Sequence, residues 1–342
     1  MKKIAKLSLV AAVAVAGLTN VNAASLEEAI KGVDVSGQFR FRAQEKTDNG
    51  SNSDVEVEVG VKVPVTDTVT AVFKIDNAGN HTEGDSSTKN QVSVEDYYFS
   101  YNANGVTVNA GQQNIPGRIT DGAQGDGVVA LTTMGPVTVG AAAFMNNNIV
   151  DGLNVYSALA SANLGPVSLA GQYADVQEHG TIYNLKADAS VAMLKVGAEY
   201  TERDLDADNK DYSTTKAHVS AKVGIVSAKL SYAKTADDGS GSLDQEIEGA
   251  SEALLWNVGT NGRADYDALT IDASVAVTEA ISLRAAYLAG EEGNGTNNEV
   301  TETLGQISYK VSKNLMTYVR YADVEDKGTD YNRGRVEVKY SF

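Results

Sequence analysis

The sequence predicts an all-β fold, a single antiparallel barrel that spans a membrane, with about eighteen strands and sixteen as the alternative. Three observations lead to this prediction. Apolar and polar residues alternate with a period of two, the connections between strands alternate between short and long, and tyrosines concentrate near one end of the strands. A soluble sandwich also alternates, but it gives no reason for the other two features.

The alternation is clearest between residues 55 and 65, where every second residue is a valine. The residues between these valines are Glu56, Glu58, Gly60, Lys62 and Pro64. Successive side chains of a strand point to opposite faces, so one face is apolar and the other is polar. The same pattern fills residues 33–42 and 335–342, at the two ends of the predicted barrel.

The connections come in two classes. Short links are expected near 66–67, 102–105, 135–136, 165–166, 192–193, 224, 278–279 and 312–314. Longer polar loops are expected at 46–53, 77–91, 114–126, 146–151, 176–180, 203–212, 235–265, 290–299 and 323–332. Short periplasmic turns and long external loops are typical of outer-membrane barrels. Sixteen strands remain the alternative, because 127–134 and 253–258 carry weak patterns.

Ten tyrosines fall at the ends of strands that meet the long loops. They are Tyr97, Tyr156, Tyr173, Tyr183, Tyr200, Tyr212, Tyr232, Tyr266, Tyr287 and Tyr321. At one level of a barrel they would form an aromatic girdle at the outer interface. Tyr309, Tyr340 and Phe342 would lie at the other interface.

Residues 1–23 have the pattern of a cleaved signal peptide, and residues 24–342 are expected to form one barrel domain. Lys2, Lys3 and Lys6 precede an apolar run over 7–18, and small residues over 21–23 provide a cleavage site. The expected destination is the bacterial outer membrane, in contact with its lipid and lipopolysaccharide.

The composition excludes several function classes. The chain has no cysteine, which excludes disulfides and zinc–thiolate sites. Its net charge of −17 would become about −20 without the signal peptide, which disfavours nucleic acid as a partner. The three histidines, His81, His179 and His218, are scattered and match no catalytic motif, so no enzyme and no cofactor are expected.

The acidic loops are candidates for divalent cations such as Ca²⁺. A weak calcium pattern consists of Asp204, Asp206, Asp208 and Asp211. A calcium-binding loop also needs a glycine at the sixth position and a closing glutamate, and both are missing. A solvated acidic loop is therefore the favoured interpretation.

Residues 26–37, LEEAIKGVDVSG, resemble the mature start of the Campylobacter-type (epsilonproteobacterial) major outer membrane porins. The signal peptide and the terminal residues 340–342 extend the resemblance, whereas the middle of the chain is similar in pattern only and the chain is shorter than these relatives. The resemblance implies a homotrimeric porin of eighteen strands that favours cations. A C-terminal aromatic residue such as Phe342 is also the signal that barrel-assembly machinery recognises in this class of protein.

The third long loop, 114–126, is the candidate constriction loop, because the third external loop of general porins folds into the lumen. It carries Arg118, Asp121 and Asp126. Six bases are expected on the lumen face: Arg40, Arg42, Lys74, Arg284, Arg320 and Arg335. Barrel closure brings the first and last strands together, so these bases would cluster opposite the loop and create a transverse field. The alternative is that inward charges only keep the lumen wet.

These features predict a water-filled channel for passive diffusion of ions and small hydrophilic solutes, with a preference for cations. A substrate-specific channel and a barrel-anchored surface adhesin are the alternatives. The first would need aromatic binding residues in the lumen, where only Tyr98 and Tyr318 are evident. The loop 235–265 carries Leu254, Leu255 and Trp256, which could enter the lumen, contact a neighbouring subunit or contact lipid.

Overall fold

The computed structural model describes residues 32–47, 50–77, 80–82, 92–120, 123–149, 152–241, 253–293 and 296–342. The described residues contain no helix of the length and hydropathy that would span a membrane. The predicted signal peptide lies outside the described residues and stays a prediction.

Most of the described residues form β-strands that are linked by turns and loops. They are β1 (Asp34–Lys46), β2 (Gly50–Pro64), β3 (Val69–Asp76), β4 (Asn80–Thr82), β5 (Ser93–Ala103), β6 (Val106–Asn114), β7 (Gln124–Met134), β8 (Val137–Asn147), β9 (Val155–Leu164), β10 (Val167–Val176), β11 (Gly180–Val191), β12 (Leu194–Leu205), β13 (Tyr212–Val223), β14 (Val226–Thr235), β15 (Tyr266–Ala276), β16 (Ile281–Glu292), β17 (Glu299–Lys310), β18 (Leu315–Asp326) and β19 (Thr329–Ser341). Each long strand pairs antiparallel with its neighbours, and β4 pairs with the outer end of β2.

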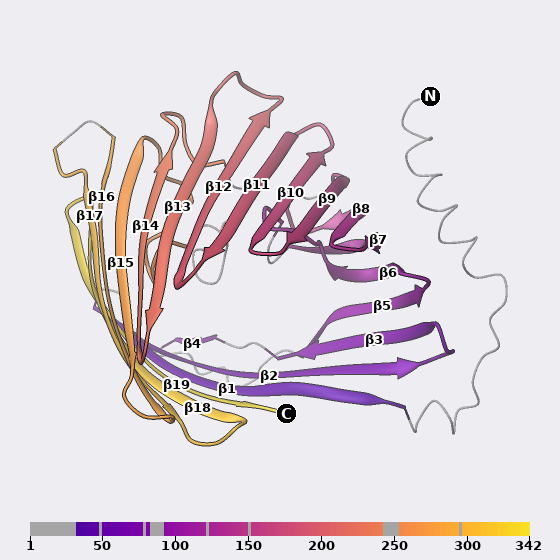
Figure 1. Ribbon diagram of the computed structural model, residues 1–342, viewed down its shortest axis with the longest axis horizontal. Coiled ribbons are helices and arrows are strands. Elements are labelled where there is room, and N and C mark those ends of the chain that lie inside the picture. Colours follow the sequence, from indigo (N-terminus) through magenta and orange to yellow (C-terminus); the bar gives the residue numbers. More distant parts are fainter. Residues whose placement is uncertain are drawn as a thin grey trace.

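The barrel is closed by eighteen of these strands, which confirms the predicted fold. Closure occurs where β1 pairs with β19, from Gln38 opposite Ser341 to Lys46 opposite Arg333. In Figure 1 these two strands lie side by side although they come from opposite ends of the chain. Because the sheet has no free edge here, every strand finds hydrogen-bond partners on both sides, as a membrane requires.

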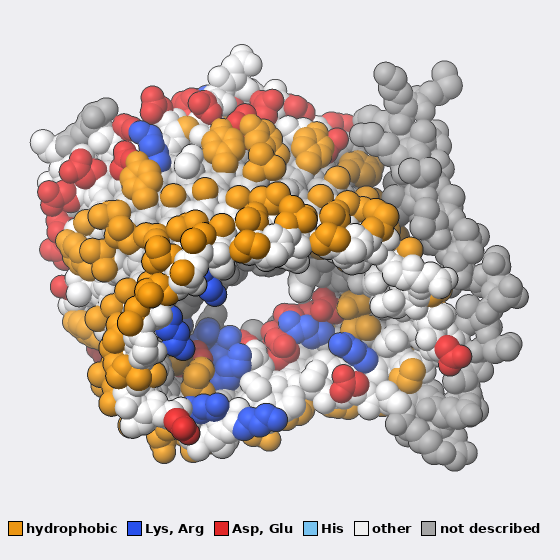
Figure 2. Space-filling model, in the orientation of Figure 1, with side chains coloured by type: hydrophobic (Ala, Val, Ile, Leu, Met, Phe, Trp, Pro, Cys, Tyr) orange, Lys and Arg blue, Asp and Glu red, His pale blue; other side chains and the backbone are white. Residues whose placement is uncertain are grey.

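The outer face of the barrel is apolar, and the opposite face carries the charges. On β1, Phe39 and Phe41 are exposed, whereas Arg40 and Arg42, which alternate with them, form ion pairs with neighbouring strands. Figure 2 shows hydrophobic side chains over the outside and charged side chains within the hollow, many of them over β1–β3. The period-two pattern thus separates a lipid face from a lumen face, as predicted.

The tyrosine girdle is confirmed for most of its members. Five tyrosines are exposed on the outer face near the long connections: Tyr97, Tyr173, Tyr232, Tyr287 and Tyr321. Tyr156, Tyr183 and Tyr200 are half-buried on the same face. Two assignments were wrong. Tyr266 is fully buried on the lumen side, and Tyr212 shares its face with buried Thr214 and lies 4.5 Å from the Arg203 guanidinium.

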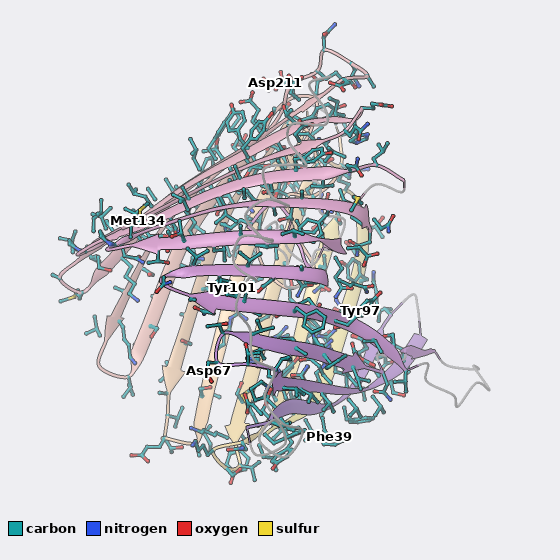
Figure 3. All side chains as sticks on the ribbon, turned by 90° about the vertical axis from the view of Figure 1, so that its right-hand side faces the viewer. Phe39, Asp67, Tyr97, Tyr101, Met134 and Asp211 are labelled. Atoms are coloured by element: carbon teal, nitrogen blue, oxygen red, sulfur yellow. The ribbon has the colours of Figure 1, made fainter. Side chains whose placement is uncertain are left out.

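All eight predicted short links coincide with short connections, but several outer loops are shorter than predicted. The predicted loops at 46–53, 176–180, 203–212 and 323–332 become connections of 47–49, 177–179, 206–211 and 327–328. In Figure 3, Met134 at a short turn and Asp211 in an outer connection lie far apart at different ends of the strands. The strands therefore continue into polar sequence that was predicted to form loops.

The C-terminal residue completes the seam between β1 and β19. The Phe342 amide donates to the Gly37 carbonyl oxygen, and the Gly37 amide donates to that of Phe342, both at 3.1 Å. The Phe342 ring centroid lies 5.8 Å from that of Phe39 and 6.1 Å from that of Tyr340. This aromatic cluster is at the end of the barrel where the sequence predicted the second interface.

Candidate functional site

The third long loop folds into the lumen, as predicted. Ile115 and Ile119 are each only 2% exposed and pack against lumen-facing residues of β7–β11. The side chain of Gln172 on β10 donates to the Pro116 carbonyl oxygen at 3.2 Å and to Thr120 Oγ1 at 3.0 Å, and it accepts the Ile119 amide at 3.1 Å. One wall glutamine thus holds three successive parts of the loop.

The charges of this loop differ from the prediction of an acidic loop that faces a basic wall. Arg118 donates two hydrogen bonds to Glu199 on β12, at 2.7 and 2.8 Å. Asp121 lies outside the described residues. Asp126 belongs to β7, where it accepts a hydrogen bond from Asn146 at 3.1 Å, so it is a barrel residue and not a loop residue. The charged contact described between loop and wall therefore joins a basic loop side chain to an acidic wall side chain.

The predicted lumen bases do lie on the polar face, but the wall is not uniformly basic. Four of the six pair with carboxylates: Arg40 with Glu56, Arg42 with Glu337 at 2.6 Å, Lys74 with Glu58 and Glu95 at 3.1 and 2.9 Å, and Arg284 with Asp272 at 2.6 Å. These ion pairs were not predicted from the sequence. Alternation places most of the carboxylates on the same face, and cross-strand register sets Arg40 opposite Glu56 and Arg42 opposite Glu337.

The remaining two bases, Arg320 and Arg335, each lie over the ring of a tryptophan. Their guanidinium carbons lie 4.9 and 5.1 Å from the Trp256 ring centroid, and Arg333, which the sequence analysis missed, lies at 4.6 Å. Arg335 also donates to Gln44 Oε1, and Arg320 to Gln306 Oε1, both at 2.7 Å. At these distances a guanidinium group and an aromatic ring attract each other through a cation–π interaction.

Trp256 belongs to a second in-folded segment, residues 253–263, between β14 and β15. Trp256 and Val258 are buried with lumen-side apolar residues of β15–β18. The apolar patch of the loop 235–265 therefore lies in the lumen, which selects one of the three placements left open by the sequence.

The far end of this segment is fixed by Arg263. Its guanidinium bonds to Asp326 at 2.7 and 3.1 Å and to Glu292 at 2.7 Å. Burial opposes the charged form, but these carboxylate partners outweigh burial and raise the pKa of Arg263. The guanidinium therefore stays charged at neutral pH, where it can hold both carboxylates.

The weak calcium pattern is not assembled into a metal site. Within the described residues, no group of three or more acidic or histidine side chains is arranged to hold a metal ion. Asp208 instead accepts a hydrogen bond from the Tyr212 hydroxyl at 3.2 Å, and the Asp211 amide donates to Asp238 at 2.9 Å. Binding of divalent cations elsewhere on the acidic loops stays a prediction.

Solved structures with the same fold include several proteins of Pseudomonas. The chain is similar to Pseudomonas aeruginosa OpdK, solved with vanillate, with a TM-score of 0.74, 13% identity, and coverage of 91% of this chain and 99% of that one. For P. aeruginosa OccK11 (OpdR) the TM-score is 0.75 at 9% identity, with coverage of 91% and 96%. For a BenF-like porin of P. fluorescens Pf-5 it is 0.73 at 12% identity, with coverage of 91% and 99%.

At these identities the solved structures establish the fold alone. No curated protein matches the sequence. Residues 1–202, more than half of the sequence, match the family described as the Campylobacter major outer membrane protein. The closed barrel, its polar lumen and this match agree with one another. The chain belongs to the Campylobacter major outer membrane protein family.

Proposed function

We propose that this outer-membrane porin lets ions and small hydrophilic solutes diffuse passively through its lumen. The observation that carries the proposal is the closed barrel with an apolar outer face and a charged inner face. The concentration gradient supplies the driving force, so the proposed function requires no catalysis. A channel of this kind needs polar walls that replace part of the hydration of a solute.

A preference for cations is part of this proposal. The net charge of −17 includes many carboxylates in the outer connections, which would raise the local concentration of cations at the mouth. We expect a reversal potential of cation-selective sign when purified protein in a planar bilayer separates two KCl concentrations. The opposite sign would refute the preference, and absence of conductance would instead favour a surface adhesin anchored by a barrel.

We further propose that the sequence-predicted bases and the third loop act at the constriction. Arg40→Ala would leave Glu56 without its ion-pair partner, and Asp121→Ala would remove a carboxylate from the loop. Both changes are expected to shift the reversal potential, the first toward cations and the second away from them. If both variants kept the parent conductance and selectivity, the inward charges would serve only to hydrate the lumen.

A substrate-specific channel is the second candidate. It is favoured by an ordered polar network on the wall, in which the Tyr318 hydroxyl donates to Glu337 at 3.0 Å and Arg42 holds the same carboxylate. Saturable block of the ion current by one solute would support this candidate.

The proposed partners are a second and third copy of this chain in a trimer, lipopolysaccharide, and the barrel-assembly machinery during biogenesis. The exposed apolar belt and the C-terminal Phe342 support contacts of this kind.

A further inference from the structure

An apolar patch lies on the lumen side of β16–β18, where a water-filled pore gives no reason for one. It includes Leu288, Val300, Leu304 and Val324, all at most 1% exposed. Residues 253–263 cover this patch, with Trp256 and Val258 buried against it. Wall and segment thus form a small dry core inside the lumen, and apolar burial favours the in-folded position.

Glu302 is the polar centre of this core. It projects from β17, has no exposed surface, and accepts the backbone amides of Trp256, Asn257 and Val258 at 3.3, 2.9 and 3.0 Å. Asn257 Nδ2 adds a further bond at 2.9 Å. A buried carboxylate is costly without hydrogen bonds, and successive backbone amides form a concave anion site. The wall carboxylate therefore specifies one position and one backbone conformation for the segment.

Neighbouring contacts fix the same segment from other directions. Asn257 Oδ1 accepts a hydrogen bond from Arg333 at 3.0 Å, so one side chain links Glu302 to the arginines around Trp256. Arg263 binds Asp326 and Glu292 at the end of the segment. The third loop rests on β7–β12, whereas this segment rests on β15–β19, so the two occupy different sectors of the wall.

We infer that residues 253–263 are a second constriction element and that Glu302 is the positioning residue that holds them in the lumen. The constriction role of residues 253–263 deepens the proposed channel function and rests on it. The position of the segment does not depend on that function, and it can be measured separately.

Trp256 allows this measurement because it is the only tryptophan in the chain. Glu302→Gln keeps the size of the side chain but replaces one acceptor oxygen with an NH₂ group that faces backbone amides. We expect the segment to leave the wall. The acrylamide quenching constant of Trp256 should then rise roughly twofold or more as local opening exposes the ring. Single-channel conductance should increase by a factor on the order of 1.5 to 2 as the lumen widens.

Glu337→Gln is the matched control. Glu337 is a similarly buried wall carboxylate that bonds to Arg42 and Tyr318 on the barrel. The Glu337→Gln variant should leave Trp256 as protected from acrylamide as it is in the parent protein. Asn257→Ala removes one of the bonds to Glu302 from the segment side and leaves the barrel strands unaltered. The quenching constant of Trp256 should therefore rise, but by less than in Glu302→Gln. Heat-modifiable gel mobility identifies folded barrels for every variant.

The outcomes separate the two parts of the inference. Parent-like quenching in folded Glu302→Gln and Asn257→Ala would overturn the positioning role of Glu302. Exposed Trp256 with unchanged conductance would overturn the constriction role while the channel function stood. If the parent itself did not conduct, the proposed function would fail, and the quenching result would still decide the position of the segment.

Discussion

Gly37 is the residue on which the barrel seam depends most closely. A Cβ atom at this position would overlap the Glu58 backbone oxygen and lie 2.8 Å from Phe342 Cζ. The missing side chain leaves room for the terminal ring, which packs beside Phe39. Gly37 and Phe342 also exchange the last backbone hydrogen bonds of the seam.

We therefore predict that Gly37→Ala destabilises the folded barrel by about 1–3 kcal/mol, the usual cost of forcing extra volume into a packed site. Gly60→Ala is the control on the neighbouring strand, because its Cβ would meet Ser36 Oγ at an ordinary 3.4 Å. The measurement is the urea midpoint of unfolding, followed by heat-modifiable gel mobility. Equal midpoints for the two variants would show that the Glu58 backbone and the Phe342 ring both move aside without cost.

At the level of single side chains, the sequence predicted which face of the barrel a residue points to, but not which residue it pairs with. Period-two alternation correctly placed Arg40, Arg42 and Arg284 on the lumen face. The same rule also assigns Glu56 and Glu337 to that face, but the ion pairs depend on cross-strand register. Register follows from turn lengths summed around the barrel, so it cannot be obtained from one strand alone.

At the level of elements, the short turns were predictable and the outer connections were not. Turns such as 104–105 and 135–136 interrupt apolar alternation, which makes them visible in the sequence. Above the outer interface neither face of a strand needs to be apolar. The polar end of a strand and a polar loop therefore have the same sequence pattern. The hairpin between β18 and β19 is the clearest case. Lys327 and Gly328, with φ of 52° and 79°, make a two-residue turn within a predicted ten-residue loop.

The in-folded segment did leave a signal in the sequence. Residues 300 and 304 on β17, and 288 on β16, are apolar at positions that face the lumen. Strands with two apolar faces are buried on both sides. This pattern predicts a covering segment, and it also explains why Tyr266 turns inward. The identity of the anchor could not be predicted, because Glu302 and Asn257 are 45 residues apart.

At the level of the whole molecule, the lumen wall and the outer connections carry different kinds of charge. Wall carboxylates such as Asp272, Glu199 and Glu337 have basic partners within hydrogen-bond distance. The connection 206–211 carries three aspartates and one lysine, so it contributes to the net charge of −17 at the mouth of the barrel. An ion in transit would therefore meet ion-paired carboxylates such as these in the wall and an excess of acidic side chains at the mouth.

This division predicts that the proposed cation preference depends strongly on salt. Screening acts over about 10 Å at 0.1 M ionic strength and about 3 Å at 1 M, so charge at the mouth loses its reach at high salt, whereas charge in contact with the ion does not. Reversal potentials measured at a fixed KCl ratio should therefore give a permeability ratio that falls toward unity as the mean concentration rises from 0.1 to 1 M. A ratio that stays constant over this range would place the selectivity in the wall, where the ion is close to the charges that select it.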